Sequence, residues 1–151
     1  IMSYTVVSSF HPEILQTTKI LALLPVRFLC LCVHEAAVEK VRQMLKTHSI
    51  PIHSCETVSR WPGTVYSGIS PVWELKIEIT VSRIESLAVF LDLLLSDDFC
   101  RFYCDFSLQD ENDHPWFIAV PHEGDYYFQL MDANYEEIYE VLQTAGITAQ
   151  Q

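Results

Sequence analysis

Hydrophobic and polar residues alternate most regularly in residues 72–81, VWELKIEITV. A period of two places alternate side chains on opposite faces of a β-strand. The pattern therefore predicts a strand with one face on the main core and the other face wet. The residues expected to face the core are Trp73, Leu75, Ile77, Ile79 and Val81, and those on the other face are Glu74, Lys76 and Glu78.

Other segments follow the strand period or the helix period. Residues 28–33 predict a strand that is apolar on both faces, as in the centre of a sheet, and residues 34–48 predict an amphipathic helix. Residues 52–60 and 99–108 predict two further strands. Residues 82–98 predict a helix that opens with a Ser-x-x-Glu capping box and is apolar almost all round, so we expect it to have neighbours on two sides.

The order of these elements from residue 28 to 108 is strand, helix, strand, strand, helix, strand. This order predicts an α+β fold with a ferredoxin-like β-α-β-β-α-β core over about residues 28–108. An N-terminal helix is expected over residues 8–20, with Ser9 as its cap. A C-terminal hairpin (116–120 and 126–130) is followed by a helix over 132–145, with Asp132 as N-cap and Gly146 as its stop. The whole chain, 1–151, is predicted to form a single domain.

Charge is distributed unevenly along the chain, whose net charge is −11. Residues 1–91 hold seven acidic and eight basic residues, whereas residues 92–151 hold thirteen acidic residues and one basic residue, Arg101. Nucleic-acid binding needs the opposite sign, so that function class is excluded. The acidity favours a basic protein partner, and solubility alone is the alternative explanation. The longest apolar run, residues 20–33, is too short for a bilayer and predicts no membrane anchor.

Two groups of residues are candidates for contacting such a partner. Trp61 and Tyr66 flank a Pro-Gly turn in RWPGTVY, and both residue types are enriched at binding hot spots. The alternative is that these rings fold back onto the core. The second group contains the acids of the loop 109–114 and the turn 121–125, namely Asp110, Glu111, Asp113, Glu123 and Asp125.

The cysteines and histidine of FLCLCVHE (28–35) raise the question of a metal site. Zinc ligands usually come in pairs separated by two to four residues, but Cys30 and Cys32 are separated by one. We therefore expect these cysteines to pack in a buried strand, His34 to open the next helix, and no metal or cofactor to be bound. Five cysteines without framework spacing predict reduced thiols and a cytoplasmic location.

Motifs of catalysis are missing from the sequence. It contains no P-loop, no G-x-S-x-G, no H-E-x-x-H and no dinucleotide fingerprint. An enzyme whose site residues are dispersed in the sequence stays open as an alternative.

Part of the chain resembles a known family. SRWPGTVYSG and WELKIEITVSRIESL, within residues 59–87, are similar to the middle of CutA-type divalent-cation-tolerance proteins, and IAVPHEGDYY (118–127) is similar to a late stretch of that family. The resemblance implies a ferredoxin-like trimer linked to metal tolerance. Two motifs depart from the family, because Cys32-Val33-His34 replaces Cys-Pro and His114-Pro115-Trp116-Phe117 lacks the expected glutamate. No metal ligand is carried over.

Two functions follow from these observations. The first is a non-enzymatic acidic interaction protein, like an inhibitor or an immunity protein, that binds a basic protein partner. The alternative is an oligomeric ferredoxin-like regulatory domain that binds a small ligand or a metal.

Overall fold

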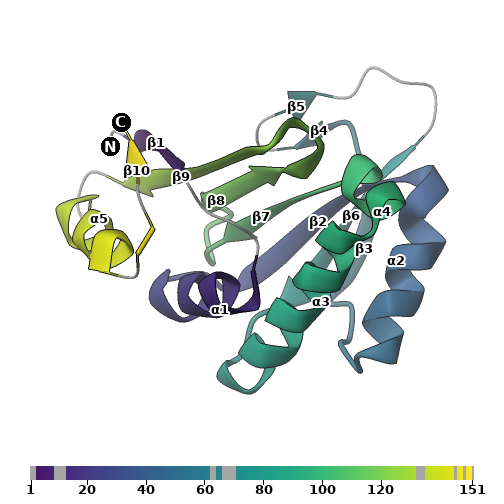
Figure 1. Ribbon diagram of the computed structural model, residues 1–151. Helices are drawn as coiled ribbons and strands as arrows, with labels where there is room; N and C mark the ends of the chain where they lie inside the picture. Colours follow the sequence, from purple (N-terminus) through teal and green to yellow (C-terminus); the bar gives the residue numbers. More distant parts are fainter. Residues whose placement is uncertain are drawn as a thin grey trace.

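One antiparallel sheet forms the centre of the molecule (Figure 1). The computed structural model describes residues 3–8, 13–61, 64–65, 71–131, 135–144, 146–147 and 149–150. Its eight-stranded sheet has the order β10-β1-β9-β8-β7-β2-β6-β3. The strands are β1 (Ser3–Ser8), β2 (Phe28–His34), β3 (Ser54–Val58), β6 (Val72–Glu78), β7 (Cys104–Gln109), β8 (Pro115–Val120), β9 (Asp125–Met131) and β10 (Ala149–Gln150). A separate hairpin contains β4 (Arg60–Trp61) and β5 (Thr64–Val65).

Helices cover one face of this sheet. The helices are α1 (Ile14–Leu23), α2 (Glu35–Thr47), α3 (Ile84–Ser96), α4 (Asp98–Tyr103) and α5 (Tyr135–Thr144), and two short 3-10 turns are η1 (Val81–Arg83) and η2 (Pro121–Glu123). Figure 1 shows α1, α2 and α3 on the same side of the strands. The α+β class predicted from the sequence is confirmed. No helix in the described part of the chain is long and apolar enough to cross a membrane.

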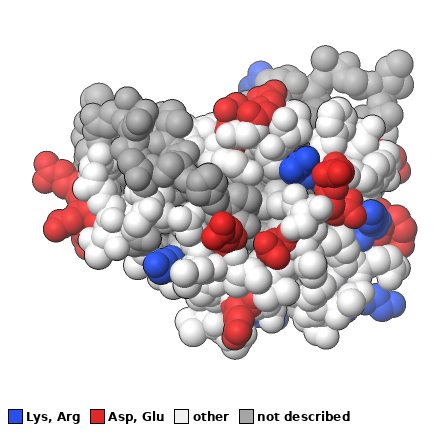
Figure 2. Space-filling view, in the orientation of Figure 1, with Lys and Arg blue, Asp and Glu red and all other residues white. Residues whose placement is uncertain are grey.

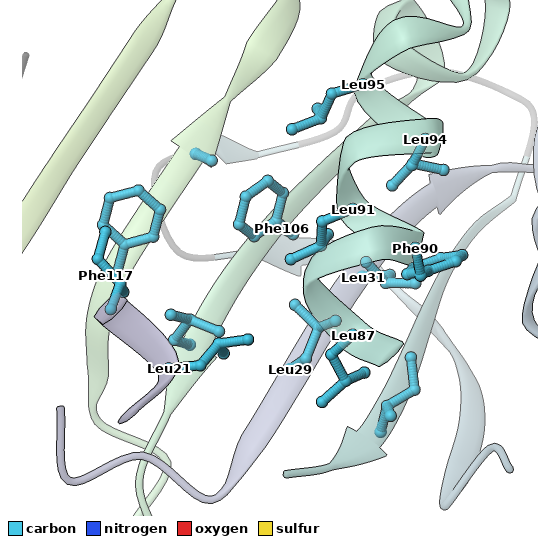
Figure 3. Packing of buried hydrophobic residues seen from close by; sticks show 14 of the residues in the cluster. Leu21, Leu29, Leu31, Leu87, Phe90, Leu91, Leu94, Leu95, Phe106 and Phe117 are labelled. Carbon is cyan, nitrogen blue, oxygen red and sulfur yellow. The ribbon is translucent and has the colours of Figure 1, made fainter. Parts of the chain in front are cut away.

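The main core lies between the sheet and these helices. Leu29, Leu31 and Val33 of β2 are fully buried in it. The side chains of α3 point toward the sheet, where Leu87, Phe90, Leu91 and Leu94 are buried (Figure 3). α3 also contacts α1 and α2, which explains why this helix is apolar almost all round.

A second, smaller cluster lies on the opposite face of the sheet. It contains Cys32, Trp61, Val72, Ile118 and Val120, so the β4–β5 hairpin contributes to it through Trp61. β2 pairs with β6 on one side and with β7 on the other. The prediction that residues 28–33 form a central strand buried on both faces is confirmed. The predicted helix after it is also confirmed, with His34 in the N-cap position of α2.

The strand predicted over 72–81 is shorter in the structure. It ends at Glu78, and Val81 lies in the turn η1 with 90% of its surface exposed. The expected core position of Val81 is therefore wrong, whereas Leu75 and Ile77 are fully buried. The capping box is also wrong, because α3 begins at Ile84 and Ser82 lies in the preceding turn, where it makes no cap hydrogen bond.

The strand predicted over 99–108 is half helix. Residues Asp98–Tyr103 form α4, and the strand β7 begins only at Cys104. The cause is Asp97, whose Oδ1 accepts a hydrogen bond from the backbone N–H of Cys100 at 3.0 Å and so caps a new helix. Alternating apolar residues continue through both elements, so the pattern alone does not reveal the boundary.

The two ends of the chain agree with the sequence in part. The predicted N-terminal helix lies later, at Ile14–Leu23, and the strand β1 before it was not predicted; Ser9 lies outside the described residues. The C-terminal hairpin is confirmed as β8 and β9. The last helix spans 135–144 and is followed by Gly146 at φ 79°, a left-handed position that favours glycine. Asp132 lies outside the described residues.

Candidate interaction surface

Three aromatic side chains of α4 lie together at the molecular surface. Phe99 is 42% exposed and Phe102 is 60% exposed, whereas Cys100 on the inner side of this short helix is fully buried. Tyr103 lies between the two phenylalanines, with ring centroids 5.0 Å from Phe99 and 4.9 Å from Phe102. The ring of His34 contacts Tyr103 at 5.5 Å. Exposed aromatic side chains in contact with one another are unusual on a surface that binds nothing.

The turn η2 lies beside α4 and brings acidic groups to these rings. The imidazole of His122 lies 5.7 Å from the ring of Phe102. Its Nδ1 is 3.5 Å from Oδ1 of Asp105, which is almost fully buried, and its Nε2 is 3.7 Å from Oε1 of Glu123. Gly124 follows at φ 70°, a left-handed conformation that glycine adopts without strain and that turns the chain into β9.

Tyr127 of β9 lies in a negatively charged part of the molecule. Burial raises the pKa of the Tyr127 hydroxyl, and the negative charges of Asp125, Asp105 and Glu123 raise it further. We call Phe99, Phe102, Tyr103, His122, Glu123 and Asp125 the α4–η2 surface.

The basic residues near this surface already have partners. Nζ of Lys40 lies 2.6 Å from Oδ2 of Asp97, and Arg101 Nη2 lies 3.1 Å from Oδ1 of Asp98. The hydrogen bond from Lys40 lowers the pKa of Asp97, and the backbone N–H of Cys100 adds to this effect. Within the described part of the chain, no lysine or arginine pairs with Glu123 or Asp125. These two exposed carboxylates keep their charges available to a partner.

The loop between β7 and β8 holds the other acidic residues predicted to bind a partner. Asp110 has a structural role there: its Oδ1 accepts the backbone N–H groups of Asn112 and His114, and its Oδ2 accepts the indole N–H of Trp116. Burial opposes ionisation of Asp110, but these hydrogen bonds outweigh it and lower its pKa. Glu111 lies 3.5 Å from Arg27, and Asp113 lies 3.2 Å from Lys76.

The two acidic groups lie at opposite ends of β8. The loop 110–114 precedes this six-residue strand and the turn 121–125 follows it, which separates them by roughly 20 Å. On the face that Figure 2 shows, acidic side chains lie in several separate groups, with uncharged areas between them. The predicted acidic residues therefore divide into a loop group with internal partners and a turn group beside exposed aromatic rings.

Of the two aromatic residues predicted from RWPGTVY, Trp61 folds back onto the sheet, which was the alternative to an exposed position. Trp61 is only 4% exposed and packs in the second cluster beside Cys32 and Val72, so its expected role as an exposed contact is wrong. The physical reason is that β4 places its ring on the apolar part of the sheet face opposite the helices. Tyr66 lies outside the described residues.

Phe99 and Phe102 were not predicted as site residues. The sequence pattern placed them in a strand, where Phe102 would have been buried with the cysteines. The signal that reveals them is Ser96-Asp97-Asp98, a set of residues typical of a helix end followed by a new helix start. A short helix in place of a strand turns both rings outward.

The buried cysteines are divided between the two faces of the sheet. Cys104 lies opposite Val33 in the sheet register, on the helix-covered face with Cys100, whereas Cys32 packs in the cluster on the other face. Burial raises the pKa of Cys30 to about 12 and that of Cys100 to about 11, which disfavours the thiolate that binds metals. Among the described residues, no group of three or more His, Cys, Asp or Glu side chains is arranged to hold a metal ion.

Two open hollows lie at the end of the sheet away from η2. One has a volume of about 510 Å³ and is lined by Pro25, Val26, Arg27, Ile79, Asp110, Glu111 and Asn112. The other has a volume of about 330 Å³ and is lined by Pro51, Ile52, His53, Glu78 and Arg83. Their lining is mainly polar and charged rather than the apolar wall with few polar groups that is typical of small-molecule sites.

Comparisons of this chain with family models, with curated proteins and with solved structures found no match.

Proposed function

We propose that this protein is a non-enzymatic interaction domain that binds a basic protein partner, as inhibitor and immunity proteins do, and that the α4–η2 surface makes the contact. The observation that carries the proposal is the exposed ring of Phe102, which contacts His122 of the turn that holds Glu123 and precedes Asp125. Of the acids proposed from the sequence, Glu123 and Asp125 are kept in this site. Glu111 and Asp113 have internal basic partners.

Aromatic side chains and exposed carboxylates contribute to binding in different ways. Burial of an aromatic side chain in a complex provides affinity, and such residues are frequent among binding hot spots. Exposed carboxylates at the rim attract a basic partner before contact and increase the association rate. A net charge of −11 favours the same class of partner over a nucleic acid.

The proposed location is the cytoplasm. None of the five cysteines forms a disulfide in the structure, and buried cysteines without disulfides are typical of proteins from reducing compartments. We propose no contact with a membrane. Self-association of the protein is compatible with the proposed function.

We further propose that residues 28–109 form a ferredoxin-like unit. The strand order β7-β2-β6-β3 supports this assignment, since neighbouring strands in it are antiparallel and the connections through α2 and α3 lie on the same face. The extra strands β8, β9, β1 and β10 extend the sheet on one side.

A second candidate function follows from the same topology and from the open hollows. Ferredoxin-like units, including the CutA-type proteins that residues 59–87 resemble, can form regulatory oligomers, and the 510 Å³ hollow beside Arg27 offers a place for a small ligand. Screening of metabolites by thermal unfolding tests this candidate. A ligand whose stabilisation is lost in Arg27→Ala would favour it over the interaction domain.

Photo-crosslinking inside the producing cells tests the main proposal. A benzophenone amino acid is placed at position 99 or 102, and at position 15 as the matched control, because Leu15 is an exposed apolar residue on α1. We expect one basic protein to be captured from positions 99 and 102 but not from position 15. Its capture should weaken in Glu123→Gln/Asp125→Asn. Equal capture from all three positions would contradict the proposed surface.

A further inference from the structure

We propose that the α4–η2 surface recognises an arginine side chain of the partner, which stacks on the ring of Phe102 and pairs with the carboxylate of Glu123. This inference rests on the proposed function of the surface. It adds the chemical class of the group that the surface selects.

The ring of Phe102 is exposed and yet held in position. Its side chain is 60% exposed, while Tyr103 packs edge-on against it at 4.9 Å and His122 lies at 5.7 Å. A ring fixed by two neighbours loses little conformational freedom when a ligand covers it. Phe102 is therefore arranged to bind a flat or apolar group.

One exposed carboxylate, that of Glu123, is linked to this ring through His122. The imidazole of His122 lies between Phe102 and Glu123, with Nε2 3.7 Å from Oε1 of Glu123. Asp98 lies one turn before Phe102 in α4, but its carboxylate already pairs with Arg101 at 3.1 Å. A cation above the ring is thus attracted by the ring and by the carboxylate of Glu123.

The same surface already holds one cation in this manner. Nζ of Lys40 lies 5.7 Å from the ring centroid of Phe99 and is fixed by Asp97 at 2.6 Å. In the described residues, the other cations that lie over rings are Arg27 and Lys76, and both are on Phe28. Phe102 is more exposed than Phe99 and has carboxylates nearby, but no cation of the described chain lies over its ring.

Arginine fits this site better than lysine for geometric reasons. A guanidinium group is planar and weakly hydrated, so it can stack on an aromatic face and donate hydrogen bonds to a carboxylate at the same time. An ammonium group is a strongly hydrated point charge and gains less from the ring. The surface should therefore distinguish arginine from lysine even though the two carry the same charge.

The test uses two peptides with blocked ends. One carries arginines beside a leucine, and the other is identical except that lysines replace the arginines. Binding to the full chain is followed by NMR titration. We expect the arginine peptide to bind more tightly and Phe102→Leu to weaken it by about two- to fivefold, since this change removes the ring and keeps an apolar side chain. Phe102→Leu should also remove the preference for arginine. Leu15→Ala, at an exposed apolar site on α1, should change neither property.

Charge variants separate the possible failures. Glu123→Gln/Asp125→Asn is compared with Glu136→Gln/Glu137→Gln, which removes two exposed carboxylates of α5. The arginine inference is overturned if both peptides bind equally, if Phe102→Leu leaves their binding unchanged, and if Glu123→Gln/Asp125→Asn still weakens it. The acidic surface would then stand. If the two charge variants weaken binding equally, peptide binding is non-specific and the proposed surface itself is overturned.

Discussion

The indole N–H of Trp116 donates a hydrogen bond to Oδ2 of Asp110 at 2.9 Å. Trp116 is 4% exposed, so the carboxylate of Asp110 satisfies a polar group that is nearly closed off from water. The other oxygen of the same carboxylate accepts the backbone N–H groups of Asn112 and His114 at 2.8 and 3.0 Å. One side chain therefore fixes the loop between β7 and β8, including Asp113 at φ 61°.

Asp110→Asn should destabilise the protein by about 1–3 kcal/mol. The amide oxygen can still accept the two backbone N–H groups, but the amide nitrogen then faces the indole N–H of Trp116, and two donors cannot bond. Urea unfolding monitored by tryptophan fluorescence measures the change. Glu111→Gln is the matched control, because Glu111 is 74% exposed and its loss should cost well under 1 kcal/mol. Equal losses in both variants would show that the carboxylate has no special role.

The contribution of Asp110 should also depend on pH. Its pKa is lowered in the folded protein, so its ionised form is stabilised by folding. The resulting stability is fully present above the unfolded-state pKa of about 3.9 and is lost as the pH falls through the lower folded-state value. The difference in unfolding free energy between wild type and Asp110→Asn should therefore shrink in acid below about pH 4. A difference that is constant down to pH 2 would contradict this account.

Ile77→Ala should cost about 2–5 kcal/mol, because Ile77 is fully buried beneath the helices and the smaller side chain leaves a cavity. Lys76→Ala, at the adjacent position on the other face of β6, should cost about 1 kcal/mol or less, since Lys76 makes a partly exposed ion pair with Asp113. Chemical denaturation of both variants compares the two faces directly. Comparable losses would mean that both faces of the sheet are equally covered.

Period-two patterns predicted the strands well where a strand is flanked by clear turn residues. β2 and β6 were predicted from their alternation, and β8 and β9 from the hairpin between them. The pattern was misleading at residues 99–108, because a short helix followed directly by a strand can keep an apolar residue at every second position. The strand β1 was missed because its pairing with β9 is between distant parts of the chain.

Cysteine reactivity provides a test of the core. Cys30, Cys32, Cys100 and Cys104 are buried, and only Cys55 is partly exposed. Burial raises the pKa of Cys30 to about 12 and that of Cys100 to about 11, so these thiols have little thiolate at neutral pH. We expect a thiol reagent to modify Cys55 rapidly and the other four only on unfolding. Rapid loss of a second thiol in Cys55→Ser would show that one of the buried positions opens.

The candidate site was predicted from the sequence only in part. The acidic character of residues 92–151 was visible, as were Glu123 and Asp125 within it. The sequence could not show that Glu111 and Asp113 face Arg27 and Lys76, because these pairs join residues far apart in the chain. It also could not show that the exposed rings of α4 would contact the turn η2. α4 precedes β7 and η2 follows β8, so the contact depends on how β7 and β8 pair.

The exposed ring of Phe102 in α4 should contribute little to folding. Phe102→Ser is expected to change the unfolding free energy by about 1 kcal/mol, because the side chain of Phe102 keeps 60% of its surface in water. Phe90→Ala, in the main core, should cost about 3–5 kcal/mol. Thermal unfolding of both variants tests the contrast. A large loss in the α4 variant would assign this ring a structural role and remove the main reason for proposing a binding surface.

Association with the natural partner should be sensitive to salt through Glu123 and Asp125. These carboxylates have no lysine or arginine partner among the described residues, so their field extends into solvent until salt screens it. The screening length falls from about 10 Å at 0.1 M salt to about 3 Å at 1 M. Glu123→Gln/Asp125→Asn should therefore reduce the association rate at low salt more than it increases the dissociation rate, and the effect should vanish at high salt.

Glu111→Gln/Asp113→Asn, at the other end of β8, is the matched control, because its carboxylates are already opposed by Arg27 and Lys76. Stopped-flow measurements at several salt concentrations separate the two rates. If both double variants slow association equally, steering comes from the net charge of the whole molecule and not from the α4–η2 surface.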